Sequence, residues 1–192
     1  MGVSTEPECI EKWADFIGRF TVPPKGKWLF RGVLSDWKFK PSLERVCEDW
    51  GVLPTERPLV EKRLLREFKR AYPPRAEIPA PRHSDDLAWL ALMQHYGAPT
   101  RLLDWTFSPF IAAFFALDLL LSSKEPTTAT VWALSDDATS NAAVEVFLPV
   151  NLRAPFKEYS RTRCGPAFRK VFLEADPPFT FVSPVNPYVR TQ

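Results

Sequence analysis

Arg31 is the first residue of this 192-residue sequence whose type and setting suggest chemistry. It follows the apolar, aromatic residues 28–30, which predict a short buried strand over 28–31. An arginine at the end of a buried strand needs an anionic partner, either a carboxylate of the protein or a phosphate of a ligand. Gly32 comes next, at a position where the backbone can bend or approach a ligand closely.

A second polar stretch, residues 94–108, lies between two apolar segments and reads QHYGAPTRLLDWTFS. A protein core excludes such side chains unless they are paired. They are therefore either a structural network, in which Arg101 pairs with Asp104 and the hydroxyls cap turns, or a ligand site. His95 is likewise either a ligand contact or a capped imidazole of the core. The candidate ligand contacts are Arg31, Gly32, Gln94, His95, Thr100, Arg101, Thr106 and Ser108.

Two apolar helices are predicted to hold this polar loop in place. The first is capped by Ser84, carries acids in its first turn and ends at Gly97, a residue that tolerates a left-handed C-terminal conformation. The second is capped by Ser108 and starts at Pro109. Residues 110–121 are too few to span a bilayer and too apolar for a surface helix, so we expect the central, fully buried helix there.

The remaining elements complete an α+β fold, with helices packed on short, mostly antiparallel strands. A first helix is expected to start near Ser4 or Thr5, and an amphipathic helix over 59–72. The basic face of that helix is either solvated or contacts nucleic acid. Further strands are expected at 129–135 and 143–149, and the proline-flanked segments 179–183 and 188–192 close the chain.

Composition limits the possible functions. With 25 basic and 23 acidic residues, no overall field favours a polyanion, and with only two histidines we expect no zinc site. Three separated cysteines and an N-terminus without an apolar signal favour the cytoplasm, and we expect no membrane association. The length fits a single domain.

Two motifs together resemble the FRG domain family. They are FRG itself, at residues 30–32, and the much more specific QHYGAPTRLLDWTFSPFIAAFFA at residues 94–116. Residues 37–45 and 186–192 fit the same family. Its last motif normally continues into a Gly-x-Phe element, whereas this sequence ends at Gln192. The resemblance therefore implies one FRG-like domain over residues 1–192 that is truncated at its C-terminal end.

The same motifs are similar, more weakly, to ADP-ribosyltransferases of the arginine–serine–glutamate type. That similarity implies that Arg31 holds a phosphate or ribose of NAD, and that Thr106 and Ser108 hold the nicotinamide ribose. A late acid or amide would bind the ribose 2′-hydroxyl and stabilise positive charge as nicotinamide leaves. Gln192 is the preferred residue for that role and Glu145 the alternative, so the implied catalytic residues are Arg31, Gln192 and Glu145.

The function implied by these resemblances is an NAD-dependent ADP-ribosyltransferase or NAD-cleaving domain of a bacterial toxin or phage-defence protein. Its acceptor is a protein, a nucleic acid or water. One alternative is a non-catalytic module that binds a nucleotide or a nucleic acid through the same polar loop. The other is a structural domain in which Arg31, Arg101 and Asp104 only satisfy one another.

Overall fold

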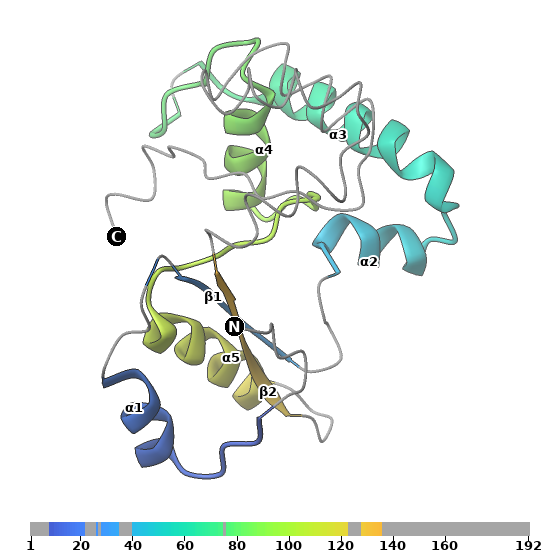
Figure 1. The fold of residues 1–192 in the computed structure, drawn as a ribbon. Helices are drawn as coiled ribbons and strands as arrows, with labels where there is room; N and C mark the ends of the chain where they lie inside the picture. The colour runs from blue at the N-terminus through green and yellow to red at the C-terminus, as the bar shows by residue number, and fades with distance from the viewer. Residues whose placement is uncertain are drawn as a thin grey trace. The chain divides into compact units, whose positions relative to one another are not determined.

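The computed structural model describes residues 8–21, 26, 28–34, 40–74, 76–122 and 128–135. They divide into two compact units. The sheet unit contains the described residues up to 34 and from 105 to 135, and the helical unit contains those from 40 to 104. The described residues form five α-helices and a two-stranded antiparallel sheet (Figure 1), which confirms the predicted α+β class.

The sheet unit is built on strand β1 (Trp28–Leu34), which pairs with β2 (Ala129–Ser135). The register is antiparallel and runs from Trp28 opposite Ser135 to Leu34 opposite Ala129. On its other edge β1 is bridged by Thr106. The N–H of Phe30 donates to the Thr106 carbonyl at 2.7 Å, and the Thr106 N–H donates to the Phe30 carbonyl at 2.8 Å. Both predicted strands are confirmed, and β1 continues three residues past the expected end at Arg31.

Helix α5 (Pro109–Ser122) packs on β1 through small residues. Its buried residues are Ala112, Ala113 and Ala116. Opposite them lies Gly32, where an added Cβ would stand only 1.8 Å from the carbonyl oxygen of Ala112. Backbone therefore meets backbone at this contact. Gly32 is needed here because any side chain would force the helix away from the strand.

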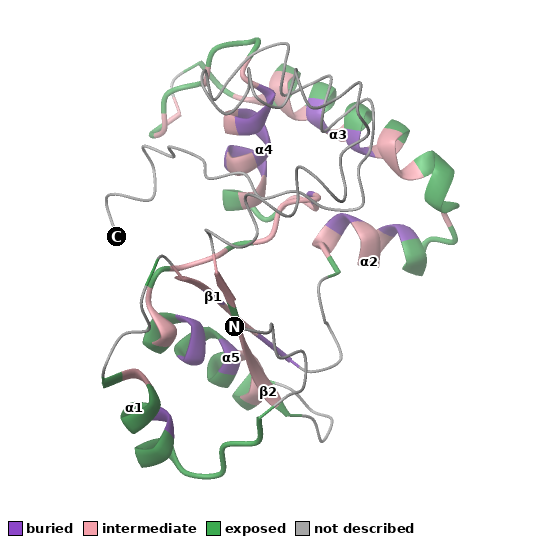
Figure 2. Cartoon of the chain, in the orientation of Figure 1, coloured by how far each residue is buried: buried purple, intermediate pink, exposed green. Residues whose placement is uncertain are grey.

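The prediction that α5 is buried on all sides is wrong for the structure described. Large side chains along the helix are exposed, so α5 shows buried and exposed residues side by side in Figure 2. The physical reason is the width of the contact, because one strip of small residues against a narrow sheet covers a single face of a helix. The exposed side chains are Phe110, Ile111, Phe114, Phe115, Leu117 and Leu121.

Helix α1 (Trp13–Thr21) completes the described part of the sheet unit. Its buried residue is Phe16, which stacks on Trp13 with ring centroids 5.1 Å apart and also contacts Phe20 and Phe110. The prediction of a helix start near Ser4 or Thr5 is wrong, because residues 8–12 are not helical and the helix begins at Trp13. The apolar spacing that suggested an earlier start includes Ile10, which is exposed and precedes the helix.

The helical unit contains α2 (Ser42–Asp49), a short 3-10 turn η2 (Pro54–Glu56), α3 (Arg57–Ala71) and α4 (Asp86–His95). Its core lies mainly on α4, with Leu65 of α3 contributing, and both predicted helices are confirmed. The N-cap of α4 is Asp85, whose Oδ1 accepts from the Ala88 N–H at 3.1 Å, so the prediction of Ser84 as the cap is wrong by one residue. Gly97 has a φ of 78°, the left-handed conformation predicted for it.

The predicted strand at 143–149 and the segments at 179–183 and 188–192 lie outside the described residues. Within the described residues, none of the helices combines the length and the apolar character needed to cross a membrane.

Candidate functional site

The polar residues of the 94–108 stretch fall in both units, and those up to Asp104 form a network in the helical unit. The buried hydroxyl of Thr100 donates to Oε1 of Gln94, and Nε2 of Gln94 donates to Oδ1 of Asp104 at 2.6 Å. The Leu102 N–H donates to Oγ1 of Thr100 at 3.2 Å. The hydroxyl and the amide thus hold the loop after α4 in one conformation.

Thr100 also joins this loop to the start of α2 through its backbone. Its N–H donates to Oγ of Ser42 at 3.0 Å, and its carbonyl accepts from the Ser42 hydroxyl at 3.2 Å and from the Leu43 N–H at 3.1 Å. Buried backbone groups must be paired somewhere, and Ser42 and Leu43 supply those partners. The α2 helix therefore depends on the loop for its position.

Arg101 pairs with Glu61 of α3. Its Nε donates to Oε2 of Glu61 at 2.6 Å, and its backbone N–H lies 3.3 Å from Oε1. Glu61 is only 2% exposed, so this is a buried ion pair. The predicted pair of Arg101 with Asp104 is replaced by this one, because Glu61 is buried and Asp104 is exposed, where it accepts from Gln94.

The hydroxyls of Thr106 and Ser108 lie in the sheet unit and start α5. Oγ1 of Thr106 accepts from the Ser108 N–H at 3.1 Å, and Oγ of Ser108 accepts from the Ile111 N–H at 3.4 Å. Both hydroxyls therefore cap turns, and Ser108 is confirmed as the cap of α5. Each hydroxyl keeps its own hydrogen as a possible donor.

Arg31 lies on β1 next to this cap, since its neighbour Phe30 is the residue that pairs with Thr106. Residues opposite each other in an antiparallel pair share a face of the sheet, and successive residues alternate. The side chain of Thr106 therefore lies on the Phe30 face and that of Arg31 on the other. Arg31 is paired with Trp132 of β2 while Thr106 bridges the other edge of β1, so the two side chains lie one residue apart along the strand and on opposite faces.

The other predicted site residues are placed differently. His95 is exposed at the last position of α4, with its ring 5.6 Å from that of Tyr96. Gly32 faces Ala112, which accounts for a glycine there without a ligand. Glu145 and Gln192 lie outside the described residues, and their proposed roles remain predictions.

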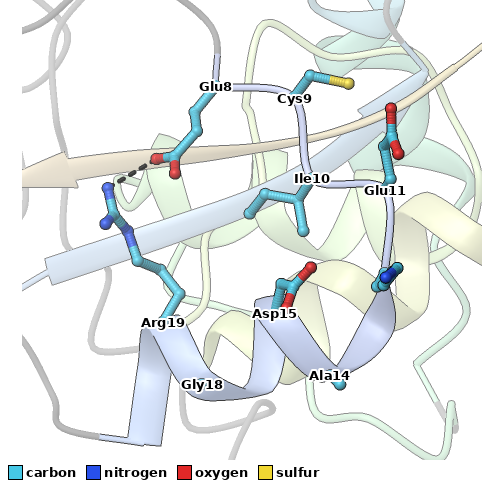
Figure 3. A pocket seen from close by; sticks show the side chains of 9 residues that line it. Glu8, Cys9, Ile10, Glu11, Ala14, Asp15, Gly18 and Arg19 are labelled. Atoms are coloured by element: carbon cyan, nitrogen blue, oxygen red, sulfur yellow. Dashed lines mark hydrogen bonds and ion pairs between the residues drawn. The ribbon is translucent and has the colours of Figure 1, made fainter.

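Two cavities of the described structure are lined by other residues. One, of about 720 Å³, lies between residues 8–12 and α1, where Arg19 and Glu8 form an ion pair at 2.6 Å (Figure 3). The other, of about 180 Å³, lies at the ends of α3 and α4. Among the described residues, no group of three or more histidines, cysteines or acids is arranged to hold a metal ion.

Two ionisable groups on α2 have displaced pKa values. Burial raises the pKa of the Cys47 thiol, so this cysteine stays protonated at neutral pH and is a poor nucleophile. A hydrogen bond from Lys40 lowers the pKa of the exposed Glu48 carboxyl, and the nearby positive charges of Lys40 and Arg57 also lower it. Neither group lies among the predicted site residues.

Sequence reasoning missed Glu61 and Ser42, the two partners that make the loop a network. A signal for Glu61 was present, because it lies four residues before Leu65, on the apolar side of α3. An acid on the buried face of a helix indicates a buried cationic partner. Ser42 gave no comparable signal, since a serine at a helix start is common.

Comparisons with known proteins give one match. The family profile described as FRG domain matches residues 26–136, which is more than half of the chain. The match covers β1, all the elements of the helical unit, α5 and β2. Neither the curated proteins nor the solved structures contain a match to this chain.

Proposed function

The chain belongs to the FRG domain family, and from the arrangement of its β1 arginine we propose that it is an NAD-dependent ADP-ribosyltransferase or NAD-cleaving domain. The observation that carries the proposal is the position of Arg31 on β1, next to the residue paired with Thr106, which leads through Ser108 into α5. An arginine on a strand beside hydroxyls at a helix start can hold the phosphates and a ribose of one dinucleotide.

Each of these groups has a defined part in the proposed reaction. The Arg31 guanidinium binds a phosphate of NAD with two parallel hydrogen bonds. The hydroxyls of Thr106 and Ser108, already fixed as acceptors of backbone N–H groups, donate to ribose oxygens. A ligand that reaches both sets must pass around the Thr106 segment, because that segment fills the edge of β1 at Phe30 and the two sets lie on opposite faces of the sheet.

The bond that breaks joins C1′ of the ribose to the nicotinamide nitrogen. Nicotinamide leaves with the bonding electrons, C1′ gains positive character, and a nucleophile of the acceptor or water attacks it and releases a proton. Gln192, or alternatively Glu145, stabilises the positive charge in this proposal. A carboxylate stabilises such a charge better than an amide, so the reaction rate depends on which of these two residues has the role.

The polar network of the helical unit acts within that unit. Gln94, Thr100 and Arg101 bind protein groups in the structure, and these bonds fix the loop after α4. His95 is exposed and is the member of the 94–101 set best able to contact a ligand. We place the domain in the cytoplasm, as part of a bacterial toxin or phage-defence protein.

Incubation of the full chain with NAD, with nicotinamide release followed by chromatography, tests the proposal. Arg31→Lys is expected to lower release at least about tenfold, because lysine is a point charge without the planar fork, while the melting temperature stays within about 2 °C. The matched control is Arg66→Lys on the exposed face of α3, which should leave release unchanged. Absence of nicotinamide release from the unaltered chain, or full release by Arg31→Lys, would overturn the proposal.

A second candidate function is nucleotide binding without turnover. It is favoured by the capping role of Thr106 and Ser108, because both oxygens already accept hydrogen bonds from the backbone. Calorimetric titration with NAD distinguishes the two functions. Binding that Arg31→Lys weakens, in a chain that releases no nicotinamide, identifies a binding module.

A further inference from the structure

The cavity at the ends of α3 and α4 is lined by aromatic rings. It has a volume of about 180 Å³, and its walls are Phe68, Ala71, Tyr72, Pro73 and Tyr96. Sites for drug-sized ligands have roughly 300–1,000 Å³, so this cavity fits one small group or one side chain. All five wall residues belong to the helical unit.

The three rings lie close together and are inclined to one another. Ring centroids are 5.6 Å apart for Phe68 and Tyr72, 5.9 Å for Tyr72 and Tyr96, and 6.2 Å for Phe68 and Tyr96, with interplanar angles of 42°, 72° and 47°. A cation centred about 3 Å above a triangle of this size lies within about 5 Å of all three centroids, inside the roughly 6 Å range of a cation–π interaction.

The rings are held in place before any ligand binds. The Tyr72 hydroxyl donates to the Ile78 carbonyl at 2.6 Å, and the buried Trp89 packs edge-on against both Phe68 and Tyr72. Trp89 is fixed in turn by its Nε1–H, which donates to the Arg82 carbonyl at 3.1 Å. A preorganised site loses little side-chain entropy on binding. Tyr96, 52% exposed, forms the outer wall.

The electrostatics of the cavity favour positive charge. Tyr72 and Tyr96 are the C-cap residues of α3 and α4, so both helices end here. Helix C-termini carry partial negative charge, as do the faces of aromatic rings. Two cations near the cavity are already neutralised, because Lys69 pairs with Asp86 at 2.6 Å and Arg70 with Glu67 at 3.2 Å. A ring that packs against Phe68 and Tyr72 already has a cation over it, since Nζ of Lys69 lies 5.6 Å from the centroid of Trp89.

From this geometry we infer that the cavity between Phe68, Tyr72 and Tyr96 is a binding site for a quaternary ammonium group. Such a group is cationic, has an apolar surface and donates no hydrogen bond, which matches walls of rings, Ala71 and Pro73. The chemistry is shared by a trimethylated lysine of a partner protein and by a free choline-like molecule. The inference does not depend on the proposed reaction with NAD.

The test compares a cation with a neutral molecule of the same shape. Choline and 3,3-dimethylbutan-1-ol are titrated separately into the full chain, and binding is followed by NMR shifts of the tyrosine rings. Choline is expected to bind at least about fivefold more tightly than the neutral alcohol. Equal affinities would show an apolar cavity without preference for charge and would overturn the inference, as would absence of choline binding at millimolar concentration.

Three variants locate the binding. Tyr96→Ala removes the outer wall and is expected to abolish the preference for choline, whereas Tyr96→Phe keeps the ring and the preference. The matched control is Trp50→Ala, which removes another exposed aromatic residue, 70% exposed at the end of α2. Unchanged choline binding by Tyr96→Ala would overturn the inference. The comparison of choline with the neutral alcohol uses the unaltered chain, so it still tests the inference if Tyr96→Ala lowers the melting temperature.

A further titration distinguishes the two sources of the group. A peptide with one trimethyllysine that binds more tightly than choline, and more tightly than the same peptide with unmodified lysine, identifies a protein partner. Choline that binds at least as tightly as the peptide identifies a small molecule. Either result supports a quaternary ammonium site at the three rings.

Discussion

Helices α4 and α5 are both strongly apolar, yet they are buried to very different extents. In α4 six residues are buried, including Leu90, Leu92 and Met93, whereas in the longer α5 the buried residues are three alanines. Apolar composition therefore does not tell how much of a helix is covered. Among the described residues the surroundings decide it, since α4 forms the core of the helical unit while α5 packs on β1 and β2.

The two helices also differ in what fixes them. The surroundings of α4 include two ion pairs with almost fully buried acids, Glu61 with Arg101 and Asp86 with Lys69. For α5 the decisive contact is between backbones, where Gly32 meets Ala112. Buried charges and close backbone contacts fail in different ways on mutation, so the comparison can be tested by substitution.

The largest expected effect comes from the buried ion pair of the helical unit. Arg101→Met leaves the Glu61 carboxylate buried without its main partner, and the free energy of unfolding should fall by about 4 kcal/mol. Urea denaturation followed by tryptophan fluorescence measures this change. Arg66→Met, at a side chain 64% exposed, is the control and should change stability by less than about 0.5 kcal/mol.

A double variant shows whether burial of the Glu61 charge without the Arg101 side chain is the cause. Glu61→Leu combined with Arg101→Met removes both charges and should recover most of the loss, because well-packed apolar residues can replace a buried pair. If the double variant is as unstable as Arg101→Met alone, the pair is not what holds α3 to the loop.

The close contact beneath α5 gives the next effect. Gly32→Ala places a Cβ 1.8 Å from the Ala112 carbonyl oxygen, and the forced separation of strand and helix should cost about 3 kcal/mol. The matched control is Gly18→Ala in α1, where no heavy atom lies within 4 Å of the added Cβ. That change should stabilise the helix by about 0.5–1 kcal/mol. A tolerated Gly32→Ala would show that α5 can move away from β1 at little cost.

Truncation of one large side chain in each helix tests the difference in burial directly. Met93→Ala in α4 removes a fully buried side chain and should lower stability by about 2.5 kcal/mol. Phe114→Ala in α5 removes a side chain that is 63% exposed and should change it by less than about 0.5 kcal/mol. A cost for Phe114→Ala equal to that for Met93→Ala would contradict the exposed face of α5.

Most of the local structure could be predicted from the sequence, apart from α2 and the starts of α1 and α4, and the long-range parts could not. Spacing of apolar residues and turn-forming residues sufficed for α3, α4, both strands, the Ser108 cap and the left-handed Gly97. The partner of Arg101 was missed, because Glu61 is 40 positions away and local spacing favoured Asp104.

The same limit applies to the two apolar features of the structure. The outward face of α5 depends on how much sheet lies beneath the helix, which its own residues do not determine. The aromatic cavity combines Phe68 and Tyr72 with Tyr96, and only the packing of α3 on α4 brings these rings together. The contact of Arg31 with a ligand and the roles of Glu145 and Gln192 stay predictions.

The smallest expected effect concerns the caps that start the two helices. Oδ1 of Asp85 accepts from the Ala88 N–H at 3.1 Å and adds a negative charge at the positive end of α4. Asp85→Ala should therefore cost about 1 kcal/mol. Ser108 caps α5 with a neutral hydroxyl at the longer distance of 3.4 Å, so Ser108→Ala should cost about 0.5 kcal/mol. Urea denaturation at low and high salt measures both, and the Asp85 effect alone should shrink as salt screens its charge.

Ser84→Ala is the control beside Asp85, because Ser84 is exposed and precedes the cap, and it should have almost no effect. A larger loss for Ser84→Ala than for Asp85→Ala would move the start of α4 by one residue. Equal salt dependence for Asp85→Ala and Ser108→Ala would show that the charge of Asp85 contributes nothing beyond its hydrogen bond.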